Sequence, residues 1–450
     1  MAHAITRGLA LAFATAPLLI ACGGGKAGDP GAVNAPQCSG ASCGVQGPPA
    51  SGTSASLCPA TADIGNSTFL GGAGSGEVVQ LNINATAMTY TLKWLASPIP
   101  LATGTVSPTR AGTQIAGAVI HPPTGALPTA EQIRCAFILG AGTGTASDGT
   151  TYTTPDFVNN PNPPMILVGQ GVAGGGIPGA TVQYAGILGI GAVNLRHFDF
   201  YPFLGFASTT TDITKLPGTY NGLLYHLSPT ANYETVATNS VETFDASGNC
   251  TSPSSSGCLS TGNALTLNSN GYFDSSSPPQ IVPSGGSPAP LRTGNFGTAH
   301  MILGQVNGAT VPLVVRTGSV NTNTLQIDDE SGIAMLAAAT PLASGGFDGG
   351  YVGADSNFKY TATLIQGAVG TFINPSTSGA ESGFGLGYGL PSPGLVGVQD
   401  TNGKTGFAIA SGGLYAIVIQ GAENGGITST SANADTPSTP YFGIGAQISK

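Results

Sequence analysis

Hydrophobic and polar residues alternate along two runs near residue 80. Residues 79–84 read Val-Gln-Leu-Asn-Ile-Asn, and residues 88–94 read Met-Thr-Tyr-Thr-Leu-Lys-Trp. A period of two places apolar side chains on one face of a β-strand and polar side chains on the other. The two runs therefore predict a pair of half-buried antiparallel strands joined by a short connection.

Similar runs recur to the end of the chain, and Gly, Pro, Asn and Ser separate them. They lie at residues 165–168, 182–190, 195–200, 223–227, 301–306, 311–316, 359–365, 407–410, 414–419 and 442–448. One segment differs, because Thr129 and Gln132 have the spacing of a helix capping box. We expect a helix at residues 129–138 and strands elsewhere, which makes the fold all-β.

Two local patterns recur in the same order along the chain. In the first pattern, an aromatic residue precedes a Tyr by 13 positions, as Tyr220 precedes Tyr233 and Phe347 precedes Tyr360. In the second, an apolar pair precedes a Gly-x-Thr strand start near residues 167, 302 and 395. Repeats of this kind favour related structural units. We expect two or three tandem antiparallel β-sandwich or β-barrel-like modules with long Gly/Ser/Pro loops, at residues 61–215, 216–341 and 342–450. Chance similarity in a chain rich in Gly and Thr is the alternative.

The composition of the chain indicates which residue types form the polar faces of the strands. The 450 residues include only 12 Lys and Arg and 21 Asp and Glu, which is 7 % charged residues, against roughly 25 % in an ordinary soluble domain. Thr, Ser, Asn and Gln must therefore supply most polar faces. The net charge of −9 and the absence of a basic cluster exclude a nucleic-acid surface, because phosphate binding needs Lys and Arg.

The N-terminus has the features of an export signal. Arg7 precedes an apolar run at residues 8–21, which is long enough for a signal peptide and too short to span a bilayer. The run ends Leu-Ile-Ala-Cys at residues 19–22, which resembles the lipobox of bacterial lipoproteins. This resemblance implies that Cys22 is acylated on sulfur and becomes the mature N-terminus. An ordinary secretory signal that happens to precede Cys22 is the alternative.

The segment after Cys22 completes the predicted anchor. Residues 1–21 are expected to be the signal peptide, and residues 22–60, rich in Gly, Pro and Ser, a flexible lipidated tether. By the sorting rule of bacterial lipoproteins, Gly23 implies the outer membrane. We therefore expect a membrane partner through a lipid anchor, on either the periplasmic or the surface face.

Six further cysteines suit an oxidising compartment, because they are even in number. Cys250 and Cys258 flank a short polar loop and are expected to pair, and Cys38 with Cys43 is a second candidate pair. The cysteines and histidines lack zinc-site spacing. We expect no metal and no cofactor.

Two polar clusters are candidate functional sites. On a strand, His197 and Asp199 share one face and could serve as a general base and its orienting carboxylate, with a serine supplied from elsewhere. They are the candidate catalytic residues, and a polar pair on a sheet surface is the alternative. His121, Glu131 and Arg134 are the candidate binding residues, although surface pairing explains them as well.

The densest acidic run is Asp328, Asp329 and Glu330. Carboxylates of this kind bind Ca²⁺, but the spacing of an EF-hand is absent. A calcium site and a solvated turn are the two interpretations of this run.

Two glycine motifs predict hairpins instead of nucleotide sites. Residues 169–174 have the Gly-x-Gly-x-x-Gly spacing of a dinucleotide-binding turn, but the following glycines and Pro178 would break the helix that this turn requires. Asn402 and Gly403 are expected to form a type I′ hairpin turn, with positive φ at both residues.

Several phrases are similar to a family of bacterial lipoproteins of unknown function. They are residues 38–43 after the lipobox, 127–132, 174–181 and 220–226. The resemblance implies an envelope location and assigns no catalytic residues. We expect an outer-membrane-anchored lipoprotein with a non-catalytic binding, adhesion or envelope-structural role and an envelope protein or glycan as partner. The alternative is an exported hydrolase acting on a carbohydrate or ester.

Overall fold

The computed structural model describes residues 58–449 with short gaps. The gaps are residues 66, 128–129, 158–161, 188–190, 253–256, 283–292, 375–378 and 420–439. The described residues all belong to one compact unit. The predicted signal peptide, most of the predicted tether, Cys22 and the candidate pair Cys38 and Cys43 lie outside them.

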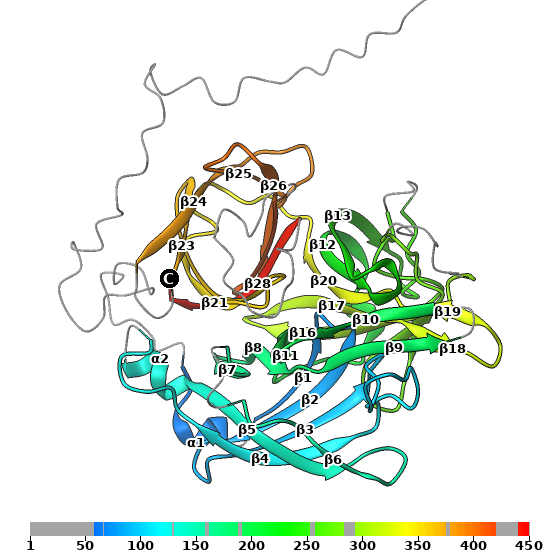
Figure 1. Cartoon of the computed structure of the whole chain (residues 1–450). Helices are drawn as coiled ribbons and strands as arrows, with labels where there is room; N and C mark the ends of the chain where they lie inside the picture. The colour runs from blue at the N-terminus through cyan, green and yellow to red at the C-terminus, as the bar shows by residue number, and fades with distance from the viewer. Residues whose placement is uncertain are drawn as a thin grey trace, which may run out of the picture. The chain divides into compact units, whose positions relative to one another are not determined.

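A first barrel occupies residues 68–206 (Figure 1). Its strand order is β4-β3-β2-β1-β11-β8-β7-β5, and β4 also pairs with β5, so these eight strands close on themselves. They are β1 (Thr68–Ala73), β2 (Glu77–Asn84), β3 (Thr89–Ala96), β4 (Gln114–Ile120), β5 (Ala136–Thr145), β7 (Met165–Val168), β8 (Val172–Pro178) and β11 (Phe200–Phe206).

Two additions extend this barrel. Strand β6 (Thr151–Thr153) pairs with the end of β5. Strands β9 (Thr181–Ile187) and β10 (Gly191–His197) form a separate two-stranded ribbon between β8 and β11 in the chain.

An open antiparallel sheet follows at residues 218–338. Its strand order is β13-β12-β20-β17-β16-β15-β14. The strands are β12 (Gly218–Ser228), β13 (Glu234–Phe244), β14 (Thr266–Leu267), β15 (Phe273–Ser276), β16 (Thr298–Val306), β17 (Ala309–Thr317) and β20 (Ser331–Ala338), while β18 (Ser319–Asn321) and β19 (Gln326–Asp328) form a small ribbon.

A second barrel closes between β21 and β28 (Figure 1). Its strands follow one another in chain order. They are β21 (Gly349–Asp355), β22 (Tyr360–Gln366), β23 (Val369–Ile373), β24 (Ala380–Gly387), β25 (Val396–Asp400), β26 (Thr405–Ser411), β27 (Leu414–Ile419) and β28 (Tyr441–Ser449).

The all-β prediction is confirmed, and much of the β structure belongs to the two barrels. Helical segments in the described residues are short: α1 (Thr61–Ile64), α2 (Ala130–Cys135), and the 3₁₀ turns η2 (Ile213–Lys215) and η3 (Pro229–Ala231). Across the ranges that the structure describes, helices of sufficient length and apolarity to cross a membrane are absent. The division into three modules stays a prediction.

The predicted helix at residues 129–138 is too long at its C-terminal end. Helix α2 ends at Cys135, and β5 begins at Ala136. Ala136 and Phe137 lie opposite Leu167 and Ile166 of β7. Strand pairing inside the barrel, which is invisible in the local sequence, ends the helix there.

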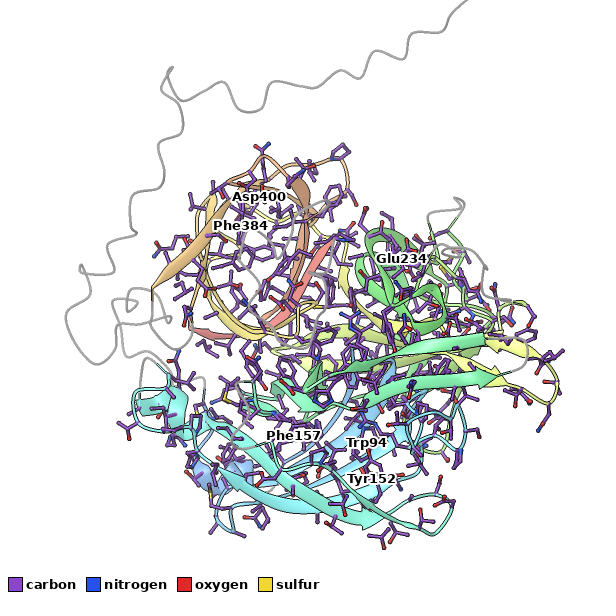
Figure 2. All side chains as sticks on the ribbon, in the orientation of Figure 1. Trp94, Tyr152, Phe157, Glu234, Phe384 and Asp400 are labelled. Atoms are coloured by element: carbon purple, nitrogen blue, oxygen red, sulfur yellow. A yellow bond between two sulfur atoms is a disulfide. The ribbon has the colours of Figure 1, made fainter. Side chains whose placement is uncertain are left out.

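Side chains fill the interiors of both barrels, as expected at this strand number. In the first barrel, Trp94 is fully buried and meets Tyr152 edge-on, with ring centroids 5.8 Å apart (Figure 2). In the second barrel, Phe384 on β24 lies opposite Asp400 on β25 and packs on Phe372 at 5.0 Å (Figure 2). The described residues thus form packed cores inside both barrels.

The two glycine motifs form hairpins, as expected, but one turn type is wrong. Residues 169–171 connect β7 to β8, with Gly169 N–H donating to the carbonyl of Val172 at 2.9 Å. Between β25 and β26, Gly403 has φ 78° while Asn402 has no positive φ. Asp400 Oδ1 accepts hydrogen bonds from the Asn402 and Lys404 N–H groups. These bonds favour a longer loop over the type I′ turn.

Candidate functional site

His197 and Asp199 lie at the base of the β9–β10 ribbon and contact each other. His197 Nε2 is 3.1 Å from Asp199 Oδ1, and the side chains are 43 % and 7 % exposed. Thr181, the first residue of β9, lies opposite His197 in the ribbon register. Its Oγ1 is 2.8 Å from His197 Nδ1. The ribbon therefore aligns a hydroxyl, an imidazole and a carboxylate.

This row has the order of a nucleophile, a base and an orienting acid. Sequence reasoning missed Thr181, because only the register between β9 and β10 brings residue 181 to residue 197. A hydrolase also requires a substrate cavity and donors for an oxyanion. The half-exposed His197 lies on the surface of the ribbon. The observed geometry therefore provides only the hydrogen-bonded row of three side chains.

A small cavity lies nearby, between the ribbon and the open sheet. Tyr184, Phe198, Tyr201 and Tyr233 line it together with Asp329, and its volume is about 20 Å³. That volume holds about one water molecule. Thr181, His197 and Asp199 are not among its lining residues. This cavity is therefore not a substrate site for the row of Thr181, His197 and Asp199.

The candidate binding residues His121, Glu131 and Arg134 each have a partner within the fold. Arg134 donates to both carboxylate oxygens of Glu131, at 2.7 and 2.9 Å, on helix α2. The hydrogen bond that Arg134 donates to Glu131 raises the pKa of Arg134. His121 instead bonds through Nδ1 to the carbonyl of Ala136 at 2.9 Å and packs on Phe137. Internal pairing explains these groups.

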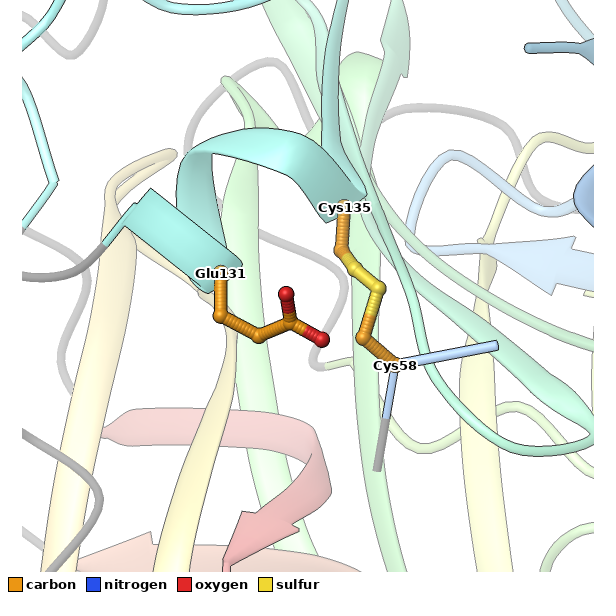
Figure 3. Close-up of side chains that lie close together, drawn as sticks. All are labelled: Cys58, Glu131 and Cys135. Atoms are coloured by element: carbon orange, nitrogen blue, oxygen red, sulfur yellow. A yellow bond between two sulfur atoms is a disulfide. The ribbon is translucent and has the colours of Figure 1, made fainter. Parts of the chain in front are cut away.

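Glu131 also lies beside a disulfide. Among the described residues, Cys58, Glu131 and Cys135 are a group whose potential metal-ligand atoms lie within 4.8 Å of one another (Figure 3). Cys58 and Cys135 are joined in a disulfide with Cα atoms 6.0 Å apart, and metals bind thiolates. Arg134 also donates to Pro59 O at 3.0 Å. The disulfide and this hydrogen bond join residues 58 and 59 to helix α2.

The cysteine pair expected at residues 250 and 258 is joined in the structure, with Cα atoms 5.8 Å apart. Sequence reasoning left Cys58 and Cys135 without partners. They are 77 residues apart, so no local loop signals their pairing.

The acidic run at residues 328–330 is buried, so the solvated-turn interpretation is wrong. Asp328 accepts from Arg316 at 2.8 and 3.0 Å and from the N–H groups of Phe296 and Gly297. Backbone and guanidinium donors thus hold both of its oxygens.

The next two carboxylates have the same kind of environment. Asp329 accepts from the hydroxyls of Ser228 and Thr230, each at 2.7 Å. Glu330 bonds to His226 Nδ1 at 2.7 Å. Burial raises the pKa of Glu330, but the hydrogen bond and charge of His226 outweigh it and leave that pKa below its usual value. The oxygens that a calcium ion would use serve internal hydrogen bonds.

A buried ion pair crosses the interior of the first barrel. Arg110 donates from Nε and Nη2 to the two oxygens of Glu77, each at 2.5 Å, and both side chains are fully buried. The guanidinium lies 4.4 Å from the ring centroid of Trp94. Burial lowers the pKa of Arg110, and the charge of Glu77 overcomes this and raises it. Glu77 and Arg110 are 33 residues apart, so no local pattern in the sequence indicates their pairing.

Comparison with known proteins gives a family without an assigned activity. The family described as "Protein of unknown function (DUF2957)" matches residues 89–446. No curated protein matches this chain.

Two solved structures of transferrin-binding protein B from Haemophilus parasuis Hp5, a single and a double mutant, show a weak likeness. Identities are 8 % and 9 %, and TM-scores are 0.22 and 0.20. Each match covers 83 % of this chain and 66 % of the other, so the chain spans about two thirds of their length. These scores are too low to support an argument about function.

Proposed function

The chain belongs to the family described as protein of unknown function (DUF2957), and we propose that it is an outer-membrane-anchored lipoprotein with a non-catalytic binding, adhesion or envelope-structural role. The observation that carries this proposal is the placement of charge. Three acid–base pairs of the described residues lie inside the fold.

Three pairs illustrate this placement. Glu77 with Arg110, Asp328 with Arg316, and Glu330 with His226 have side chains that are 0 to 2 % exposed. Buried polar groups of this kind must be paired, because an unpaired buried charge is costly. They therefore act in folding, whereas an enzyme would direct such groups into a substrate cavity.

Pairs of threonine side chains lie on the outer surface of two sheets. The Thr143 and Thr153 side chains meet at 3.2 Å on exposed strands, and those of Thr219 and Thr243 meet at 3.0 Å. Hydroxyls can both donate and accept hydrogen bonds. A surface of this kind suits recognition.

The proposed anchor is Cys22 at the end of the apolar run. Two or three acyl chains on one residue hold a protein at a membrane stably, whereas a single chain binds only marginally. The Cys58–Cys135 disulfide would then attach the tether to helix α2 of the first barrel.

Labelling with a radioactive fatty acid in a bacterial host tests the anchor. We expect the full chain to incorporate label and to sediment with outer membranes, and Cys22→Ser to lose both properties. Cys38→Ser is the matched control and should keep both. Label that persists in Cys22→Ser rules out this anchor.

Hydrolysis of a carbohydrate or ester is a second candidate function, which the row Thr181–His197–Asp199 favours. The full chain is assayed against panels of nitrophenyl esters and glycosides. Turnover that falls at least 100-fold in both His197→Ala and Thr181→Val, but not in His121→Ala, replaces the binding proposal. Inactivity of the wild type or equal activity of all variants removes the hydrolase.

A further inference from the structure

We infer that the outer face of strands β1–β6 binds a neutral polysaccharide. This inference rests on the proposed binding role and adds to it a surface and a partner class. The face consists of two neighbouring rows of side chains, which we call the threonine face. One row is Thr68, Asn82, Thr91, Ala116, Thr143 and Thr153, and the other is Gln80, Lys93, Gln114, Thr145 and Thr151.

Strand register makes each row continuous. Asn82 lies opposite Thr91, Thr91 opposite Ala116, and Ala116 opposite Thr143. Neighbouring strands are about 4.8 Å apart, so a row across six strands follows the surface for about 24 Å. The rows lie on adjacent outward positions of each strand, about 7 Å apart.

The side chains on this face are accessible. The threonines, Ala116, Gln80 and Gln114 are exposed, and Asn82 and Lys93 are half-buried. Asn82 donates to Thr68 Oγ1 at 3.3 Å, and the hydroxyls of Thr143 and Thr153 are 3.2 Å apart. These bonds hold the polar groups in a fixed pattern while leaving further donors and acceptors for a ligand.

The chemistry of the face selects the partner class. Lys93 is the charged member of the eleven residues named. Acidic glycans and nucleic acids are bound through several Arg or Lys side chains. Cores of protein interfaces are enriched in aromatic residues, Met and Arg, and none of these occurs among the eleven. Hydroxyl and amide groups instead match a ligand whose own hydroxyls both donate and accept.

The second barrel presents several glycines at the outward positions of two of its strands. On β24 and β25, Gly385 and Gly387 are exposed and Gly397 is half-buried. Glycine offers no side-chain hydroxyl or amide. The outer positions of β24 and β25 are therefore poorer in hydroxyl and amide groups than the threonine face, although Gln399 is exposed there.

Native gels that contain a polysaccharide test the inference with the full chain. The probes are dextran, mannan and laminarin, with alginate as the acidic comparison. We expect retardation by at least one neutral polymer and none by alginate. The variant Thr91→Val/Thr143→Val/Thr153→Val removes three hydroxyls at nearly constant shape and should bind at least tenfold more weakly.

Thr219→Val/Thr243→Val is the matched control, because it removes an exposed threonine pair from the open sheet. It should change affinity less than twofold, and thermal unfolding of both variants checks their folding. No retardation of the wild type by any neutral polymer, or equal loss in both variants, overturns the inference. The proposed lipid-anchored role fails separately, when Cys22→Ser still carries label.

Discussion

At the scale of residues, an aspartate at the end of a strand organises several hairpins. Asp245, Asp355 and Asp400 each accept through Oδ1 from the N–H groups two and four positions later. The residue three positions later has positive φ, as Gly248 and Gly403 show. These side-chain acceptors add to the backbone turn bonds, in which the N–H three positions later donates to the aspartate carbonyl.

Phe358 occupies the same position in the Asp355 hairpin, with φ 58°. Bulky residues rarely adopt this conformation, because the Cβ crowds the backbone. Its ring packs on Phe198 at 5.0 Å and on Tyr201 at 6.3 Å. Burial of the ring offsets the backbone strain.

Asp355 makes stability depend on pH. Burial raises its pKa from 3.8 to about 7, so the folded chain holds the proton more tightly than the unfolded chain. The contribution of Asp355 to the free energy of unfolding is full below pH 4. It falls as pH rises through 7, by up to about 4 kcal/mol. We predict that Asp355→Asn raises the unfolding midpoint at pH 8 and leaves it nearly unchanged at pH 4, measured by circular dichroism.

Asp245 provides a control of opposite sign. Hydrogen bonds from Asn249 lower its pKa, so its contribution is present at neutral pH and is lost as pH falls through the folded pKa. Asp245→Asn should therefore lower the midpoint at pH 7, with a difference that shrinks in acid. A stabilising effect of Asp355→Asn that is equal at pH 4 and pH 8 contradicts the assignment to burial.

At the scale of elements, two disulfides constrain the chain over very different distances. Cys58–Cys135 spans 77 positions and Cys250–Cys258 spans 8. Restricting the unfolded chain contributes about 4.5 kcal/mol for the long loop and about 2.6 kcal/mol for the short one on the chain-entropy model.

We predict that Cys58→Ala/Cys135→Ala costs more stability than Cys250→Ala/Cys258→Ala, by about 2 kcal/mol. Denaturant unfolding of the full chain under oxidising conditions measures both. Reductant breaks both disulfides of the wild type. Its free energy of unfolding should then be lower than that of either double variant in oxidising buffer. Equal losses for the two variants contradict the loop-length argument.

Element boundaries show where local patterns stop being sufficient. The capping-box spacing predicts a helix through residue 138, yet pairing with β7 starts a strand at Ala136. The two predicted strands near residue 80 are observed as β2 and β3, because alternation is a local property. Thr181 reaches His197 only through the ribbon register, which alternation alone does not specify.

At the scale of the whole molecule, direct contacts join the sheets. Gly72 of β1 lies against the Val315 side chain of β17, where a Cβ would collide. Tyr360 of β22 stacks on Phe200 of β11 at 4.5 Å. Its hydroxyl bonds to Pro163 O at 2.5 Å and to Met165 N at 2.6 Å. The second barrel is thereby fastened to the first.

We predict that Tyr360→Phe destabilises the full chain by about 2 kcal/mol, because it leaves a buried N–H and a carbonyl unpaired. Tyr388→Phe is the control, since Tyr388 donates within its own barrel to Gly367 O at 2.8 Å, and it should cost about 1 kcal/mol or less. Calorimetry compares the two. A larger loss in Tyr388→Phe contradicts the proposed role of Tyr360.

The sequence by itself determined the strand-rich class and the pairing of Cys250 with Cys258, because alternation and short loops are local. It is also the whole basis for the predicted anchor at Cys22. Only the tertiary structure decided the closure of the barrels, the burial of residues 328–330, and the pairing of Glu77 with Arg110. These features join residues distant in the chain through strand register and packing, and such contacts leave no periodic signal in the sequence.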